Sequence, residues 1–430
     1  MIGDVLSSYA ARFGRMHAAL SAVIPDNPTL APPVTQQQYA ISPMAMWAQL
    51  ALLGSVSEQA APELFGDAAR TREALWNVLD QPHPGCTISS MLWLGHGIDL
   101  PGIDAVADKL AERGHWTGRG IPDRFDIEHW TRQRTGGIIA EDPSGEHDPI
   151  HFQPFSAAPP ALTAAVAAVT AGTWPMPLEI CPAGELGDDW PISRVLRSSG
   201  PDCGLVRDRV LGLVGLTLNR CPNGLFVASV IADPHRSPDE VNAAALRVLR
   251  RFSSGERVFL TNAQLSAGEG DWWRVGSSPL YAGGFVEQQH NSSLMPAWST
   301  TGSYDLMTYG LDHWRTLHEG VVKRVGPPYD TALAEHTTHL EFTATGFTAA
   351  GVSGSSIVAG GLLTALLADT IPSEEPDALF TPATGGTIVE LEYCHPFAVI
   401  VGTSSEASGH LWQGVPLYSA WVAEVTEAVR

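Results

Sequence analysis

The residues best suited to chemistry are histidines that lie close to carboxylates. His336 and His339 are three positions apart, with Glu335 beside them, which could suggest a metal site. The surrounding residues alternate between apolar and polar as they do in a strand. Strand positions three apart face opposite sides of a sheet, so the two imidazoles are not expected to share a ligand. The sequence therefore predicts no metal site.

Recognised catalytic motifs are absent from the sequence as well. Gly351-Val352-Ser353-Gly354 lacks the second spacer residue that a nucleophile elbow needs before its last glycine. The sequence has no HExxH, no phosphate-binding loop and no CxxC. His313 and His318 with Asp312 are better explained as solvated loop or helix residues than as acid–base catalysts. These observations argue against an enzymatic function and predict no cofactor.

Composition excludes further classes of function. The chain has 430 residues and a formal net charge of −21, which argues against binding to nucleic acid or to an anionic membrane. The N-terminus shows no basic segment followed by an apolar one, so no secretory signal is expected and a cytoplasmic location is predicted. Five scattered cysteines without metal or redox spacing are expected to be reduced core thiols: Cys86, Cys181, Cys203, Cys221 and Cys394.

Helical patterns come first along the chain and strand patterns follow. An amphipathic helix is predicted over Val5–Val23, and a second helix begins at Ser42-Pro43 and ends at Gly54. Asn223-Gly224 between two apolar runs predicts a hairpin. Further strands are expected over Thr87–Leu94, Leu162–Trp174, Val389–Val401 and Tyr418–Val425, and an exposed loop over Pro372–Thr387. Without regular βα alternation, the order favours one α+β domain.

One segment offers a different kind of chemistry, the addition of a strand to a sheet. Thr345–Gly351 contains two glycines and small residues, and His395-Pro396-Phe397 follows some fifty positions later. A glycine, then small residues, a long loop and a strand that opens on His-Pro-Phe resemble the hinge, reactive loop and last strands of a serpin.

Motifs along nearly the whole chain carry the same resemblance. They are Ile41-Ser42-Pro43 with its helix, Ser90–Trp93, Trp130 with Thr135–Ile139, Gly172–Leu178, Met295–Trp298, Tyr304–Leu306, and His336 ten residues before Gly346. Only the region from Glu179 to Leu280 matches poorly. The order of these pieces is similar to that in the serpins, and the chain looks like a divergent bacterial serpin-like protein.

The resemblance implies a fold and a mechanism. The fold would be α+β, with N-terminal helices packed on a large central β-sheet, a β-barrel-like C-terminal part and an exposed reactive loop. Residues 1–430 would form one domain and a monomer, with 346–394 as a reactive-loop region that contains a long insertion. In the family a protease attacks the loop, which then enters the sheet as a central strand and distorts the protease, so the native fold must be metastable.

The resemblance also implies roles for particular residues. The hinge would be Gly346, Phe347, Thr348, Ala349, Ala350 and Gly351. Trp174, His336 and Ser42 would lie where the sheet opens. Counting along the loop places the reactive bond near Gly360-Gly361, with Leu362 as an alternative.

Three departures from the family pattern bear on inhibition. Phe347 occupies an inward position where inhibitory members carry a small residue, and forcing a ring into a packed site costs about 1–3 kcal/mol unless a pocket receives it. The interval from Gly346 to Pro396 is roughly twice the family length. The usual polar partner of His336 corresponds to Val166, so the imidazole would need another partner.

Three functions therefore remain open. The first is a suicide inhibitor of a serine protease, for instance a subtilisin-like one. The second is a non-inhibitory serpin-fold protein that binds an apolar ligand, a peptide or a partner. The third is a serpin-fold enzyme acting on an apolar biosynthetic intermediate, in a pocket lined by some of the thirteen tryptophans such as Trp272, Trp273 and Trp298.

Overall fold

The computed structural model describes most of the chain. The described residues are 2–23, 38–57, 68–100, 102–120, 124–139, 160–186, 190–277, 290–307, 312–358, 387–404 and 409–426. Within them the helices are α1 (Ile2–Val23), α2 (Pro43–Ser57), α4 (Ala68–Asp80), α5 (Ile103–Ala111), α6 (Arg124–Thr135), α7 (Pro238–Ser253), α8 (Asp312–Val325) and α9 (Gly409–Trp412). Two short 3-10 helices cover Ala183–Glu185 and Asn262–Gln264.

Three six-stranded sheets make up the β-structure. The central sheet has the order β13 (Trp298–Asp305), β14 (Thr331–Phe342), β15 (Gly346–Val358), β4 (Leu162–Thr173), β2 (Cys86–Leu94) and β3 (Trp116–Arg119). The second has β1 (Tyr39–Ile41), β18 (Pro416–Val422), β17 (Phe397–Thr403), β9 (Leu225–Ile231), β8 (Gly212–Arg220) and β7 (Cys203–Asp208). The third has β10 (Gly268–Gly270), β11 (Trp273–Ser277), β16 (Thr387–Glu392), β12 (His290–Met295), β6 (Arg194–Ser199) and β5 (Glu179–Pro182).

Helix α2 begins where the sequence predicts but runs past the predicted stop. The Ser42 hydroxyl accepts a hydrogen bond from the Ala45 N–H (3.2 Å), and Pro43 takes the first helical position. The helix continues through Gly54 to Ser57, so the predicted break is wrong. Nearly every residue of α2 is buried, and this packing outweighs the penalty of about 1 kcal/mol for an internal glycine.

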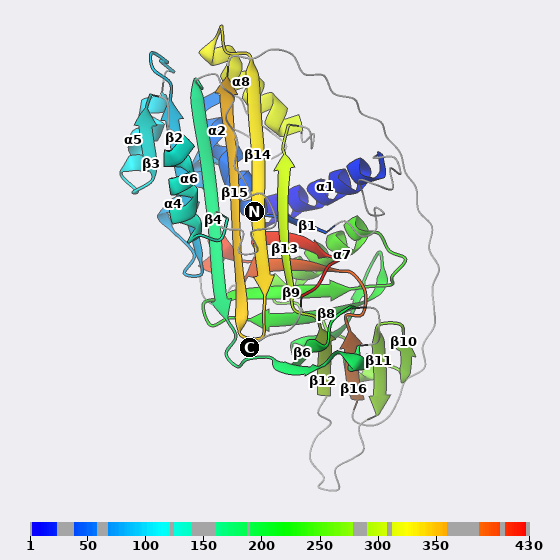
Figure 1. The fold of residues 1–430 in the computed structure, drawn as a ribbon. Helices are drawn as coiled ribbons and strands as arrows, with labels where there is room; N and C mark the ends of the chain where they lie inside the picture. Colours follow the sequence, from blue (N-terminus) through cyan, green and yellow to red (C-terminus); the bar gives the residue numbers. More distant parts are fainter. Residues whose placement is uncertain are drawn as a thin grey trace.

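The central sheet is covered on both faces. Helix α2 packs against β4 and β15 on one face, and α6 packs on the other, where Ile127 and Trp130 meet Ala165 of β4 and Val352 of β15. Figure 1 shows these long strands side by side, with β15 between β4 and β14. A strand covered on both faces needs apolar or small side chains at every position, and β15 has them.

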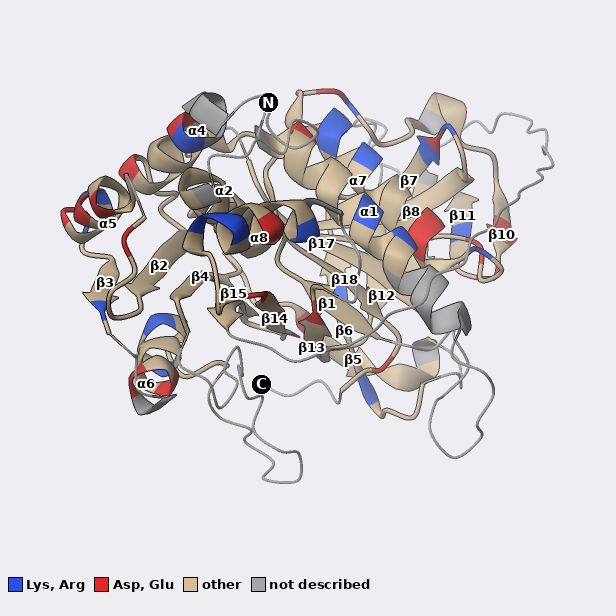
Figure 2. Ribbon diagram, turned by 90° about the horizontal axis from the view of Figure 1, so that it is seen from above, with Lys and Arg blue, Asp and Glu red and all other residues tan. Residues whose placement is uncertain are grey.

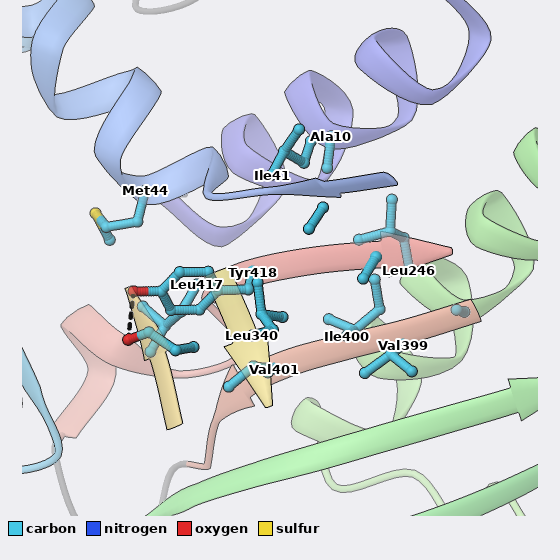
Figure 3. Packing of buried hydrophobic residues seen from close by; sticks show 14 of the residues in the cluster. Ala10, Ile41, Met44, Leu246, Leu340, Val399, Ile400, Val401, Leu417 and Tyr418 are labelled. Carbon is cyan, nitrogen blue, oxygen red and sulfur yellow. Dashed lines mark hydrogen bonds between the residues drawn. The ribbon is translucent and has the colours of Figure 1, made fainter. Parts of the chain in front are cut away.

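The second sheet forms the main core together with the helices. The predicted hairpin is confirmed, with Gly224 in the left-handed region (φ 81°) between β8 and β9. Helix α7 begins with a capping box in which Ser237 and Glu240 satisfy free backbone amides. Figure 3 shows Val399 and Ile400 of β17 in this core, with Ala10 of α1 and Leu246 of α7.

The α+β class expected from the sequence is confirmed, and the structure corrects three details. The strand region expected over Val389–Val401 is two strands, β16 in the third sheet and β17 in the second. None of the three sheets closes within the described residues, so the expected barrel-like part is a set of open sheets. Residues 346–358, expected to begin an exposed loop, form a buried central strand because their small side chains fit between β4 and β14. The five cysteines are buried and free, as expected. Among the described helices, none is long and apolar enough to cross a membrane.

Candidate functional site

The candidate site is β15, the segment that the sequence singled out for strand addition. Twelve of its positions, from Phe347 to Val358, pair with β14 in antiparallel register, and Gly346–Ile357 pair in the same way with β4. The strand has thirteen residues, of which only Thr348 is not fully buried. The predicted hinge, Gly346 to Gly351, therefore lies inside the sheet.

Alternation along β15 sorts the hinge residues onto two faces. Phe347 and Ala349 belong to the main core, whereas Ala350 and Val352 pack in the smaller cluster beneath α6. The main-core contacts of Phe347 agree with the inward position that the sequence predicts for it.

Two glycines of β15 occupy places where no side chain fits. A Cβ on Gly346 would lie 2.1 Å from the Gly172 carbonyl oxygen. A Cβ on Gly351 would lie 2.5 Å from Ser42 Cβ and 3.1 Å from Thr338 Cγ2. Ser42 cannot retreat easily, because its hydroxyl donates to the Leu417 carbonyl (3.0 Å) while capping α2. The surface that receives β15 thus requires glycine at these points.

The replacement Gly351→Ala is expected to lower the free energy of unfolding by about 1–3 kcal/mol, because the new methyl group meets a fixed helix start. Urea unfolding measures the change. Gly276→Ala in β11 is the matched control, since a Cβ there has nothing within 4 Å. If the Gly351→Ala protein is as stable as the control, β15 does not lie against Ser42.

Phe347 is received by an aromatic pocket. Its ring, 4% exposed, stacks on Trp174 with centroids 5.7 Å apart, and Trp174 in turn lies 5.3 Å from Phe342. Trp174 also caps the β14–β15 turn, because its backbone N–H donates to the Thr345 carbonyl (3.0 Å) and its indole N–H to the Thr343 carbonyl (3.0 Å). The pocket therefore receives the phenyl ring, and the contact adds aromatic packing instead of the cost expected without such a pocket.

The polar partner of His336 is a residue of β15. The Ser42 backbone N–H donates to Nε2 (2.9 Å), so this nitrogen carries no proton and Nδ1–H donates to the Ser353 hydroxyl oxygen (2.7 Å). His336 and Ser353 are directly paired across the two strands. Burial lowers the pKa of His336 to about 3, which keeps the imidazole neutral and suits both hydrogen bonds.

Other buried polar groups beside β15 also form hydrogen bonds with side chains of this strand. The Gln49 amide N–H₂ of α2 donates to the Ser355 hydroxyl (2.9 Å) and to the Ala164 carbonyl (2.9 Å). On the other face the hydroxyls of Thr163 and Ser356 lie 3.2 Å apart. Sequence reasoning missed Gln49, Ser353, Ser355 and Ser356 as site residues. A signal was available for Ser353, because a tight β14–β15 turn places it opposite His336.

The chain beyond β15 returns to a different sheet. Strand β16 pairs in parallel with β12 and antiparallel with β11, and in Figure 1 it lies near the end of the molecule where β15 begins. The 28 residues between the two strands, 359–386, can span up to about 100 Å, whereas β15 is about 43 Å long at 3.3 Å per residue. The candidate reactive bond at Gly360, Gly361 and Leu362 lies outside the described residues. So does the loop predicted over Pro372–Thr387, except for Thr387, which is the first residue of β16.

The remaining candidates form no second site. Within the described residues no group of His, Cys, Asp and Glu is placed to hold a metal ion. His336 is buried while His339 is only partly buried, and the two do not share a ligand position. His318, predicted to be solvated, is instead fully buried, stacked on Trp314 and bonded through Nδ1 to the Trp314 carbonyl (2.6 Å). Its place on the inner face of α8 explains the error.

Comparisons with known proteins agree with this architecture. No protein-family model and no curated protein sequence matches the chain. Among solved structures, a thermophilic serpin in the latent state, Tengpin, is 12% identical, with 99% of each chain covered and a TM-score of 0.56. A loop C-sheet serpin polymer is 11% identical, with 98% of this chain and 96% of that chain covered and a TM-score of 0.56. Cleaved Serpin 42Da is 12% identical, with 99% of each chain covered and a TM-score of 0.53. The chain therefore has the serpin fold, built from a strongly divergent sequence.

Proposed function

We propose that this chain is a non-inhibitory serpin-fold protein that binds a ligand or partner on a scaffold whose central sheet is already complete. The observation that supports this proposal is the position of β15. It fills the middle of the sheet in an uncleaved chain, while β16 keeps its place in another sheet.

A suicide inhibitor must store the free energy of strand insertion until a protease cuts the loop. In this chain that free energy is already released. Withdrawing β15 would remove the Ser353 hydroxyl from His336 and the Ser355 hydroxyl from Gln49. Each buried group left unpaired costs about 1–3 kcal/mol, and the aromatic contact of Phe347 with Trp174 would be lost as well. The inserted arrangement is the stable one.

The long connection supports the same conclusion. With a short loop, an uncut chain could insert β15 only by pulling β16 away from β11 and β12. Residues 359–386 are long enough to run back along the sheet, so both strands are accommodated together. No cleavage is needed to complete the sheet.

Incubation with subtilisin, elastase and chymotrypsin tests the proposal. On a denaturing gel we expect cleaved fragments and no covalent adduct of chain and protease, because no insertion remains to trap the acyl-enzyme. A known inhibitory serpin with the same proteases serves as the positive control. An adduct that survives boiling in detergent would show that the chain is an inhibitor, the function for which the small residues of β15 are also suited.

A further inference from the structure

A cavity of about 710 Å³ lies away from β15, beside the end of β7. The second half of α7 forms one wall, and the segment 256–260 forms another. An isolated bridge from Val206 to Phe259 and the hydrogen bond from the Leu260 N–H to the Leu205 carbonyl (2.9 Å) hold this segment alongside β7. The cavity is thus bounded by elements that pack together although they are distant in sequence.

The lining of this cavity is strongly basic. The chain has only 25 lysines and arginines and a net charge of −21, and six of those arginines line the cavity: Arg207, Arg209, Arg247, Arg250, Arg251 and Arg257. Two carboxylates, Asp208 and Glu256, line it as well, and Arg250 pairs with Asp4 of α1 (3.1 Å), which leaves a formal excess of three positive charges. Figure 2 shows the Lys and Arg positions of α7 and of neighbouring segments.

The two carboxylates fix part of the wall. Asp208 receives Nε–H (2.9 Å) and Nη2–H (2.7 Å) from Arg247, together with the backbone N–H groups of Val210 and Leu211 (2.9 Å each). Burial would raise the pKa of Asp208, but these donors hold it below its ordinary value. Arg251 donates twice to Glu256 Oε1 (2.9 and 2.7 Å) and once to the Arg207 carbonyl (2.9 Å). Arg247 and Arg251 are therefore locked in place.

Three other arginines of the wall are available to a ligand. Arg207, Arg209 and Arg257 are exposed, and among the residues that the structure describes none of the three pairs with a carboxylate. Like charges gathered at one cavity repel one another, and a bound anion relieves this repulsion. Arginine also offers paired N–H donors that match phosphate, sulfonate and carboxylate oxygens.

The cavity has an apolar side as well. Val258, Phe259 and Leu260 contribute to its lining. A ligand that fits both sides carries negative groups on an apolar body. The volume lies in the range of about 300–1,000 Å³ that is typical of small-molecule sites, and the acidic chain as a whole would repel an extended polyanion.

We propose that this cavity binds a small organic anion with two or more negative charges on an apolar, preferably aromatic, body. This inference deepens the proposed binding role, and rests on it for its biological meaning. It involves none of the residues of β15.

The test uses pyranine, a fluorescent aromatic trisulfonate, as the probe. Its fluorescence anisotropy is followed as full-length protein is added in low salt, about 20 mM NaCl. We expect saturable one-to-one binding that weakens at about 300 mM NaCl, where charges are screened. The double variant Arg209→Glu with Arg257→Glu is expected to bind about tenfold more weakly or worse, because two attractive charges become repulsive.

The control is Arg132→Glu with Lys323→Glu, two exposed positions on α6 and α8 that change the net charge equally. Equal binding by the two double variants, or no binding by the unmodified protein, would overturn the inference. Tighter binding of a twelve-residue oligothymidylate than of pyranine, about tenfold or more, would also overturn it, in favour of a polyanion. A protease adduct, by contrast, would remove the proposed function and leave this result untouched.

Discussion

Cutting the chain once within residues 359–386 is expected to raise its melting temperature by no more than about 2 °C. Strand β15 already pairs with both neighbours in the uncut chain, so the cut releases no strand and forms no new hydrogen bonds. If β15 entered the sheet only after cleavage, the gain of several kcal/mol would raise the melting temperature on the order of 10 °C. Differential scanning calorimetry separates these outcomes.

The cut is best made at a designed place. A short recognition site for a sequence-specific protease replaces part of Pro372–Asp377, outside the described strands. The same protein with a scrambled site, treated with the same protease, is the control. A large rise in melting temperature in the cut protein alone would mean that β15 lies outside the sheet until cleavage, and the non-inhibitory proposal would fail with it.

Much of this architecture follows from local sequence patterns. Alternation over Leu162–Trp174, the Asn223-Gly224 turn and the Ser42-Pro43 helix start each specify one element through backbone preferences that act over a few residues. The order of motifs then predicted the fold. The inward position of Phe347 also followed, because strand alternation is strict.

What sequence reasoning missed depends on pairing between distant segments. Trp174, some 170 positions away in the sequence, determines whether burying the Phe347 ring costs or gains free energy. The arginines that line the basic cavity lie between positions 207 and 257 of the sequence. They become neighbours only because segment 256–260 runs beside β7. Local helix propensity predicts that the helix ends at Gly54, but the burial of α2 outweighs this preference.

Lowering the pH from about 7 to about 5 is expected to destabilise the protein by about 4 kcal/mol through two buried histidines. Burial lowers the pKa of His336 to about 3 and that of His318 to about 4. In the unfolded chain both imidazoles titrate near 6.5, so below that pH the unfolded state takes up protons that the folded state does not. Each contributes about 2 kcal/mol at pH 5.

The geometry at His336 explains why its imidazole is not protonated in the folded state. Protonation at Nε2 would place a hydrogen against the Ser42 N–H that now donates to it, at the start of α2 and beneath β15. The loss of stability should therefore be visible in urea unfolding, with an unchanged dependence on urea at the two pH values. Burial shifts the pKa values of His83 and His115 in the same direction, whereas burial raises the pKa of Glu392 and acts oppositely.

Two variants show how much of the loss of stability at low pH comes from His336. His336→Gln is expected to reduce the difference between pH 7 and pH 5 by about 2 kcal/mol, because glutamine does not titrate. His235→Gln, at an exposed position, is the control and should leave the difference unchanged. Equal stability of the unmodified protein at both pH values would mean that these imidazoles reach solvent. In that case the His336–Ser353 contact that fastens β15 to β14 would not be closed in solution, and the complete sheet on which the proposed function depends would lose one of its main supports.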